Sequence, residues 1–449
     1  MDRILLLMTT TTYRAGAFLE AAQRLGVPAV VGSDRPQVLE AANPAGHLTI
    51  DFGVAEEAAQ AIVAFARRVP IRAVIAADDD GVVLASRAAA ALGLPHNPVG
   101  AVAAARNKLQ MREVLAKAGL PSPRFAAFSI EEDPERVARR VTFPCVLKPL
   151  FLSASRGVVR ANDPADFVAA FRRIEAILRR PEVAAQGGAQ ARRILVERYL
   201  PGVEVSLEGL LTKGELRVLA LFDKPDPLEG PFFEETIYVT PSRLPAPVQE
   251  SIVACAAAAV AALGLTHGPV HAELRWNEEG PWILEIAPRS IGGLCSRVLR
   301  FGAGISLEEL ILRHALGSDV DSLAREERAA GVMMIPIPRA GILSEVRGQE
   351  EARAVPGVEE ILLTIPVGQP VVPLPEGSRY LGFIFARDDL PERVEAALRE
   401  AHRRLTFTIA PPSETPGEGA GGGWRERDDS RQSSGSGASF RLTTPDGCE

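Results

Sequence analysis

Residues 271–289 read HAELRWNEEGPWILEIAPR and hold two strand-like runs, 271–276 and 282–287, on either side of a short polar segment. Aromatic and aliphatic residues interrupted by the turn formers Asn and Gly predict a β-hairpin. If the five residues between the runs form the loop, the two tryptophans that flank it pair, and Glu273 then lies opposite Glu285. The hairpin therefore places two carboxylates on one face of a sheet.

Opposed carboxylates repel each other unless a cation lies between them. Carboxylate oxygens without a cysteine or histidine pair suit Mg²⁺ or Mn²⁺, so Glu273 and Glu285 are candidate metal ligands. Two solvated glutamates on an exposed hairpin are the alternative, since a one-residue slip in register would separate them. Arg289 follows the second carboxylate, and an arginine beside a metal-bound phosphate neutralises charge on a transferring phosphoryl group. A surface salt bridge is the alternative for Arg289 taken alone.

The first hundred residues alternate strand-like and helix-like patterns, which is typical of βαβ units and a parallel sheet. The strand-like runs are 3–8, 28–31 and 73–76, and the amphipathic stretches are 14–25, 56–68 and 81–92. The pattern predicts a Rossmann-like domain whose first strand ends at the usual ligand crevice, beside residues 9–14. This first turn lacks the glycine fingerprint of dinucleotide binding, which disfavours a dinucleotide-dependent dehydrogenase.

A single helix is predicted over 102–118, and after it the pattern changes to strands and hairpins with fewer crossover helices. We therefore expect four parts: a Rossmann-like domain, an α+β domain, a small C-terminal α/β region and a disordered tail. Their predicted bounds are 1–105, 106–325, 326–410 and 411–449. The tail holds eight glycines, six serines and four prolines, a composition that buries too little apolar surface to fold.

Composition restricts the function classes. The 449 residues are 47% hydrophobic and 24% charged, which indicates a multidomain globular protein, and fifty basic against fifty-seven acidic residues disfavour nucleic-acid binding. The start lacks a small-residue cleavage site, and the apolar stretch 252–263 is shorter than the roughly 20 residues that cross a bilayer. Four scattered cysteines, Cys145, Cys255, Cys295 and Cys448, indicate free thiols. We therefore expect a cytoplasmic protein without a membrane or nucleic-acid partner.

The run from Glu285 to Arg289, EIAPR, together with Glu273, resembles the metal-binding signature of the ATP-grasp superfamily of carboxylate–amine ligases. Three further motifs of that family occur in the family's order. These are Lys108 at the start of a helix, Lys148 on a strand ahead of the small-residue loop 153–158, and Glu197 followed by Glu204. Only five of the fifty basic residues are lysines, so two lysines at these places favour point-charge contacts with phosphate.

The resemblance implies a role for each motif residue. It implies nucleotide binding by Lys108, Lys148, Ser153, Ser155, Arg156, Gly157, Glu197, Tyr199, Leu200 and Glu204, and metal binding by Glu273 and Glu285. It also implies catalytic roles for Arg289, which stabilises developing charge, and for Arg297, which holds a second carboxylate. Within this set the lysines hold phosphates, the loop 153–157 donates backbone N–H groups, Glu197 with Tyr199 and Leu200 reads adenine, and Glu204 accepts from ribose. Lys224, Gly292 and Gly293 are substrate-binding candidates. A phosphate-lid subdomain is implied at about 120–195.

The resemblance further implies ATP and Mg²⁺ (or Mn²⁺) as cofactors and a small carboxylate and an amine as substrates. The carboxylate attacks the γ-phosphate to give an acylphosphate and ADP, and the amine then displaces phosphate. The layout is closest to L-amino-acid (dipeptide) ligases, and segment 223–235 reads as a loop over the acceptor pocket or as a plain connection. Many members carry Asn where this chain has Ala287, which leaves open whether one or two metal ions bind.

The sequence leaves two other functions open. One is an ATP-grasp carboxylase or a purine-pathway-type ligase, which would use the same nucleotide site for another substrate. The other is an ATP-binding sensor without turnover, although a sensor has no need of an arginine that stabilises an acylphosphate. The sequence also allows a homodimer and does not identify the acyl donor, the acceptor or the role of the tail.

Overall fold

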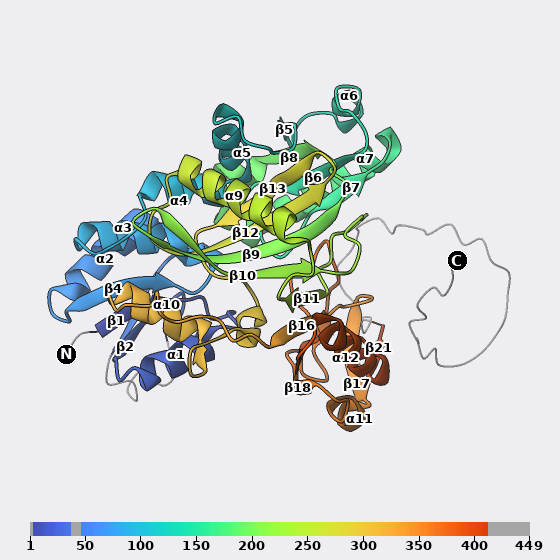
Figure 1. The fold of residues 1–449 in the computed structure, drawn as a ribbon. Helices are drawn as coiled ribbons and strands as arrows, with labels where there is room; N and C mark the ends of the chain where they lie inside the picture. Colours follow the sequence, from blue (N-terminus) through green and yellow to red (C-terminus); the bar gives the residue numbers. More distant parts are fainter. Residues whose placement is uncertain (1–2, 37–45, 412–449) are drawn as a thin grey trace.

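A computed structural model describes residues 3–36 and 46–411 of the chain (Figure 1). The predicted disordered tail, 411–449, lies outside the described residues except for Pro411. Its disorder therefore stays a prediction.

The N-terminal part is a four-stranded parallel sheet in the order β3-β2-β1-β4, as the βαβ pattern predicts. Its elements are β1 (Arg3–Leu7), α1 (Ala15–Arg24), β2 (Ala29–Ser33), β3 (His47–Thr49), α2 (Ala55–Ala66), β4 (Ile71–Ala76) and α3 (Val82–Ala91). Ile4 and Leu6 of β1 enter one hydrophobic cluster, and Leu5 and Leu7 enter another, so alternate residues face helices on opposite sides of the sheet. The fold is Rossmann-like, and it brings the ends of β1 and β4 together at one edge.

The single helix predicted over 102–118 is wrong, because the structure has two helices there. They are α4 (Val99–Arg106) and α5 (Lys108–Lys117). Asn107 between them has extended backbone angles, and its side chain accepts hydrogen bonds from the backbone N–H groups of Leu109 and Gln110, at 3.0 and 3.2 Å. Asparagine is among the best N-cap residues, so it starts a new helix inside a continuous helical pattern. The break places Lys108 at the N-terminus of α5.

A small antiparallel sheet in the order β5-β8-β6-β7 follows, covered by helices (Figure 1). Its elements are β5 (Phe125–Ser129), α6 (Pro134–Ala138), β6 (Cys145–Pro149), β7 (Val159–Ala161), α7 (Pro164–Leu178), α8 (Pro181–Gly187) and β8 (Arg193–Arg198). Phe167, Phe171 and Ile174 of α7 are fully buried against this sheet. We call these elements the lid sheet, because the segment between β6 and β7 is the predicted phosphate loop.

The central feature is an eight-stranded antiparallel sheet in the order β13-β12-β9-β10-β11-β16-β20-β18. Its strands are β9 (Val203–Thr212), β10 (Glu215–Lys224), β11 (Ile237–Thr240), β12 (Gly268–Asn277), β13 (Gly280–Ala287), β16 (Ala329–Ile335), β18 (Val358–Leu363) and β20 (Gly382–Asp388). β11 pairs with β16, with Thr240 opposite Ala330. One continuous sheet therefore joins the segments 106–325 and 326–410, which the sequence analysis predicts as separate domains.

The β12–β13 hairpin confirms that Glu273 lies opposite Glu285, although the loop differs from the one predicted. The turn is only two residues long, so Trp276 pairs with Pro281 instead of Trp282. A register shift after Glu273 inserts one extra residue on β13 and brings the two glutamates opposite each other. The predicted pairing of carboxylates thus results from a short turn combined with a bulge.

The remaining helices and strands lie around the central and N-terminal sheets or form small sheets of their own. They are α9 (Ala246–Leu263), β14 (Arg300–Phe301), β15 (Ile305–Ser306), α10 (Leu307–Ala315), β17 (Gly341–Arg347), α11 (Gln349–Arg353), β19 (Pro370–Val371), α12 (Pro391–Arg404) and β21 (Thr406–Ala410). β17, β19 and β21 form a small sheet of their own. Within the described segments, α9 alone has the length and apolar composition of a membrane span. Its residues Ile252, Ala256 and Val260 are buried in a hydrophobic cluster with β12, as in the core helix of a globular domain.

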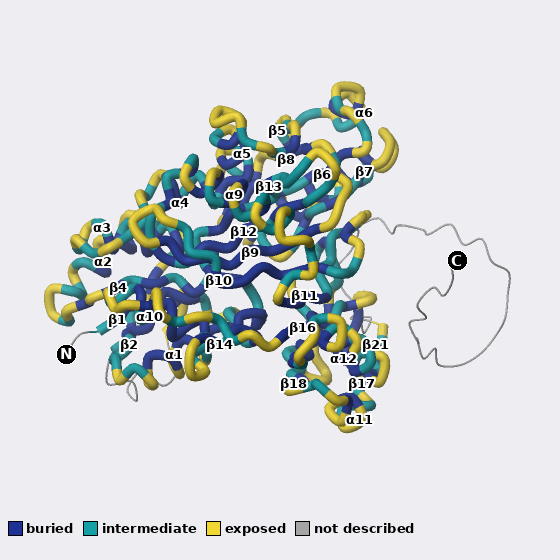
Figure 2. Tube along the Cα trace, in the orientation of Figure 1, coloured by how far each residue is buried: buried dark blue, intermediate teal, exposed yellow. Residues whose placement is uncertain are grey.

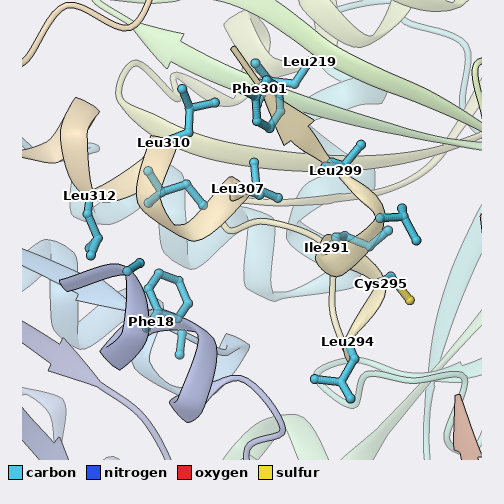
Figure 3. Packing of buried hydrophobic residues seen from close by; sticks show 14 of the residues in the cluster. Phe18, Leu219, Ile291, Leu294, Cys295, Leu299, Phe301, Leu307, Leu310 and Leu312 are labelled. Atoms are coloured by element: carbon cyan, nitrogen blue, oxygen red, sulfur yellow. The ribbon is translucent and has the colours of Figure 1, made fainter. Parts of the chain in front are cut away.

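One hydrophobic cluster joins the three parts of the chain. It contains Phe18 of α1, Phe222 of β10, Leu310 of α10 and Phe383 of β20, all fully or almost fully buried. Figure 3 shows Phe18 close below Leu312 where α1 meets α10, with Leu307 and Leu310 on the same helix. The buried strands β9, β10 and β12 run through the middle of the molecule in Figure 2. The shared core fixes the N-terminal sheet relative to the central sheet.

We predict that Gly348→Ala destabilises the C-terminal part of the chain more than Gly368→Ala does. Both glycines have positive φ, +80° and +89°, so alanine is strained at either position. A Cβ at 348 would also overlap the carbonyl oxygen of Arg404, whereas a Cβ at 368 meets nothing within 4 Å. We expect a loss of about 1 kcal/mol at 368 and a clearly larger loss at 348, read from urea unfolding. Equal losses would contradict the close packing of α11 against the end of α12.

Candidate functional site

A cavity of about 470 Å³ lies where the N-terminal sheet, the lid sheet and the central sheet meet. Most residues predicted from the sequence line it. They are Lys108, Lys148, Ser153, Ser155, Arg156, Glu197, Tyr199, Leu200, Glu204, Glu273, Glu285, Arg289, Gly292 and Gly293. Thr9, Thr11, Thr12, Tyr13 and Arg14 line its N-terminal side. Residues separated by almost three hundred positions in the chain therefore surround one space.

Three predicted site residues do not line the cavity. Arg297 is 38% exposed and pairs with Glu360 at 2.9 Å, so the structure does not bring it to the reacting centre. Lys224 lies beneath the cavity surface with its ammonium enclosed by carboxylates. Gly157 is turned away and donates its N–H to the carbonyl of Pro375, at 2.9 Å. The segment between β10 and β11 does reach the cavity, through Leu228 and Phe233.

The two opposed carboxylates interact with different lysines. Glu285 is 3.3 Å from the Nζ atom of Lys108, and Glu273 is 3.2 Å from that of Lys224. Both carboxylates border the cavity. The lysine beside each carboxylate reduces the repulsion between the two. Their oxygen donors fit Mg²⁺ or Mn²⁺, which is consistent with the predicted metal site.

A buried cluster of carboxylates surrounds Lys224. Oxygens of Glu204, Glu235 and Glu273 lie within 4.8 Å of one another, and each carboxylate forms an ion pair with Lys224. Arg275 neutralises Glu204 from the other side, at 3.0 Å. Burial raises the pKa of Glu235 to about 7, because desolvation and the nearby charges of Glu273 and Glu204 outweigh the attraction of Lys224. Glu235 ends segment 223–235, which the sequence suggested as a loop over the acceptor pocket, but no motif singles it out.

His271 lies two residues before Glu273 on β12 and contacts its carboxylate. Its Nδ1 atom is bonded to the carboxylate of Glu208, and its Nε2 atom is 3.4 Å from Glu273. Burial alone would lower the pKa of His271, but Glu208 and Glu273 outweigh it and raise the pKa to about 9. Glu208 also accepts the backbone N–H of Ile291 at 3.0 Å, which ties the glycine-rich turn to the central sheet.

Glu197 anchors two cations. Its carboxylate oxygens lie 2.6 Å from the Nε atom of Arg112 and 2.7 Å from the Nζ atom of Lys148, and Glu197 is 2% exposed. Burial alone would raise the pKa of Glu197, but the two cations outweigh it and lower the pKa to about 2. Both oxygens are engaged, so adenine recognition stays a prediction that rests on the backbone of Tyr199 and Leu200.

Arg289 is held by the N-terminal domain. Its Nη2 atom is 2.8 Å from Asp79, which follows β4, and its Nη1 atom donates to the carbonyl of Ser290 at 2.9 Å. Burial opposes ionisation of Asp79, but Arg289 and Arg106 keep its pKa well below the usual range. Asp78 and Asp80 also line the cavity. These aspartates belong to none of the motifs quoted from the sequence, although their place at the carboxyl end of a parallel strand is where α/β sheets bind ligands.

The phosphate loop adopts a compact left-handed turn. Ala154 and Ser155 both have φ of +54°, and Gly157 has φ of +73° with a Cβ position that would meet the ring of Pro149. Lys108 lies beside the loop and donates to the carbonyl of Leu152 at 2.9 Å. Successive N–H groups in such turns can form anion-binding concavities. Here the N–H of Arg156 donates to the carbonyl of Ser153 at 3.2 Å and that of Gly157 to Pro375, so the phosphate contacts of the loop stay a prediction.

The described cysteines are unsuited to nucleophilic catalysis. Cys145, Cys255 and Cys295 are free and buried. Burial raises the pKa of Cys145 to about 12 and that of Cys255 to about 11, so neither forms a thiolate at neutral pH. Cys295 lines the cavity, and burial raises the pKa of its thiol far above the usual range, so it is not a thiolate at neutral pH either.

Comparison with known proteins finds three family models that match segments of this chain. Residues 19–96 match the ATP-grasp N-terminal domain, residues 141–298 the ATP-grasp domain, and residues 333–410 the L-amino acid ligase C-terminal domain 2. The chain is an ATP-grasp domain protein with an L-amino acid ligase C-terminal domain, and the fold class predicted from the sequence is confirmed.

Individual proteins agree with this assignment. The crystal structure of L-amino acid ligase from Bacillus licheniformis is 26% identical, with a TM-score of 0.76 over 91% of this chain and 99% of that chain. Alanine–anticapsin ligase of Bacillus subtilis is 28% identical over 280 residues, covering 59% of this chain and 58% of its own length. The uncharacterized protein y4rH of Sinorhizobium fredii is 26% identical over 312 residues, or 69% and 62%. This chain thus spans less than two thirds of the length of these two curated relatives.

We predict that Glu197→Gln lowers the free energy of unfolding at neutral pH by about 3 kcal/mol, because it leaves Arg112 and Lys148 beside a neutral amide. The pKa of Glu197 falls from 4.5 to about 2 on folding, so its contribution is complete above pH 4.5 and is lost as the pH falls toward 2. The difference from wild type should shrink over that range in urea unfolding at several pH values.

Glu175→Gln is the matched control for Glu197→Gln. Glu175 pairs with Arg179 at 2.9 Å on the outer surface of α7, where solvent screens the pair. Its substitution should change stability little at any pH. A Glu197→Gln loss that does not depend on pH would contradict the ion-pair assignment.

Proposed function

We propose that this protein is an ATP-dependent ligase that joins the carboxylate of one amino acid to the amine of another, with release of ADP and phosphate. The observation that carries this proposal is the cavity itself. It combines the opposed pair Glu273 and Glu285 with Lys108, Lys148 and Arg289 in one cavity. Such a set suits phosphoryl transfer, in which the protein supplies positions and charges.

Two observations support amino acids as substrates. The C-terminal part matches the L-amino acid ligase C-terminal domain 2, and the structural similarity to an L-amino acid ligase extends over nearly the whole of that chain. Three carboxylates, Glu204, Glu235 and Glu273, pair with two cations, Lys224 and Arg275, so ionisation of all three leaves one negative charge in excess, and Glu235 lines the cavity. An ammonium group of a substrate would neutralise that charge.

The reaction has two steps. A carboxylate oxygen of the first substrate attacks the γ-phosphorus of ATP, so a P–O bond forms, the bond to ADP breaks, and an acylphosphate results. The uncharged amine of the second substrate then attacks the acyl carbon, a C–N bond forms, and phosphate leaves as the amine loses its proton to solvent. Arg289, oriented by Asp79, stabilises the negative charge that develops in both steps.

Residues that line the cavity hold the nucleotide and neutralise the charge of its phosphates. Lys148, held by Glu197, and Lys108, held near the phosphate loop, supply positive charge at the phosphates. Glu273 and Glu285 would hold Mg²⁺ or Mn²⁺, which when bound neutralises charge on the transferring phosphoryl group. Glu204 stays the candidate for the ribose hydroxyls. A cytoplasmic location, where ATP is abundant, belongs to the same proposal.

The first test is Mg²⁺-dependent release of ADP and phosphate from ATP, with single and paired amino acids. We expect release only when an acceptor is present with the donor. Glu285→Gln should reduce the rate by at least about a hundredfold, because it removes one of two carboxylates that hold the metal. The control is Glu278→Gln, which alters an exposed glutamate at the turn of the same hairpin. A wild-type rate in Glu285→Gln would refute the metal assignment.

The same assay separates the other functions. Release that requires bicarbonate or a ribonucleotide in place of a second amino acid would identify a carboxylase or purine-type ligase. Tight ATP binding without release across the whole panel would identify a sensor.

We predict that Lys148→Ala weakens ATP binding by at least about tenfold through loss of a phosphate contact. Isothermal titration with ATP and Mg²⁺ measures this directly and does not require turnover. Lys213→Ala is the matched control, since Lys213 is an exposed lysine at the β9–β10 turn. An unchanged affinity in Lys148→Ala would place the nucleotide elsewhere in the cavity.

A further inference from the structure

A short C-terminal segment contacts the phosphate loop directly. Residues 373–379 lie between β19 and β20, far along the chain from the lid sheet. The carbonyl of Pro375 accepts the N–H of Gly157 at 2.9 Å, and the carbonyl of Glu376 accepts from the Nε atom of Arg156 at 3.1 Å. Two successive residues of the phosphate loop are therefore bonded to two successive residues of this segment, which we call the clasp.

The side chain of Glu376 connects the clasp to the body of the lid sheet. Its two oxygens accept from the Nε and Nη2 atoms of Arg173 at 2.6 and 2.9 Å. This bidentate geometry is the strongest arrangement of an arginine and a carboxylate. Arg173 belongs to α7, which packs on the lid sheet, and its guanidinium also lies over the ring of Phe232. Glu376 therefore contacts the phosphate loop through its backbone carbonyl and α7 through its carboxylate.

The two residues that follow the clasp, Tyr380 and Leu381, fix its C-terminal end to the body of the protein. Tyr380 packs edge-on against Phe383 of β20, and the N–H of Leu381 donates to Ile335 of β16 at 2.9 Å. Ser378 and Tyr380 line the cavity. The clasp therefore spans from the central sheet to the phosphate loop along one wall of the site.

We propose that Glu376 is a positioning residue that holds the phosphate loop over bound ATP. The proposal rests on the proposed function, since it assigns a role in nucleotide binding. The bonds from the clasp exist only when the loop lies against the cavity, so they favour this arrangement over any in which the loop has moved away. The L-amino acid ligase C-terminal domain thereby completes a nucleotide site that is otherwise built by the lid and central sheets.

The test compares Glu376→Gln with Glu400→Gln. Glu400 is also in the C-terminal part and pairs with Arg404 at 2.8 Å on α12, away from the cavity. We expect Glu376→Gln to raise the KM for ATP by about three- to tenfold, with a smaller change in kcat at saturating ATP, and Glu400→Gln to match wild type. The exchanged pair Glu376→Arg with Arg173→Glu should recover part of the ATP affinity, which a merely misfolded variant would not do.

Hydrogen exchange gives a readout that does not depend on turnover. A peptide covering residues 153–158 should exchange faster in Glu376→Gln than in wild type, because the N–H of Gly157 loses the support of the clasp. A peptide from the buried face of α9 should be unchanged. Wild-type exchange in the loop together with a wild-type KM for ATP would overturn the proposal. If wild-type protein binds no ATP, the proposed function fails, and the exchange result alone decides whether the clasp restrains the loop.

Discussion

Two like charges held opposite each other are the constraint around which this site is built. Glu273 and Glu285 face each other across an antiparallel pair, a costly arrangement that persists only with cations nearby. Lys108 meets one carboxylate and Lys224 the other, and protonated His271 supports Glu273 from the buried side. Each of these cations is itself held by another group, so the cost is shared by a network that extends through the central sheet.

The cations expected to contact phosphate are oriented by carboxylates from different parts of the fold. Asp79 of the N-terminal domain holds Arg289, and Glu197 of the lid sheet holds Lys148. Such pairing fixes the position of a charge before any substrate arrives, and that is what a reaction without a protein nucleophile requires. It also makes the site dependent on the relative position of the parts, which the shared hydrophobic core around Phe18 and Phe383 maintains.

The C-terminal part is continuous with the rest of the protein in both sheet and site. Its strands β16, β20 and β18 extend the central sheet beyond β11, and the segment before β20 returns to the cavity through Ser378 and Tyr380. A region that looks like an appended domain in the sequence therefore forms one wall of the site. The clasp at Glu376 is the clearest consequence of this continuity.

The sequence by itself determined the local elements and the chemical inventory. The alternation of strand and helix patterns predicted the N-terminal sheet, and the hairpin pattern predicted that Glu273 opposes Glu285. These features depend on neighbours in the chain, which a pattern reports. The break at Asn107 also has a local signal, the N-cap preference of asparagine. The tertiary structure alone decided the bulge that restores the hairpin register and the partners Asp79, Glu235 and Glu376. It also decided that Arg297 pairs with Glu360 outside the cavity. Those outcomes depend on which distant segments share a core or a sheet edge, and no local pattern carries that information.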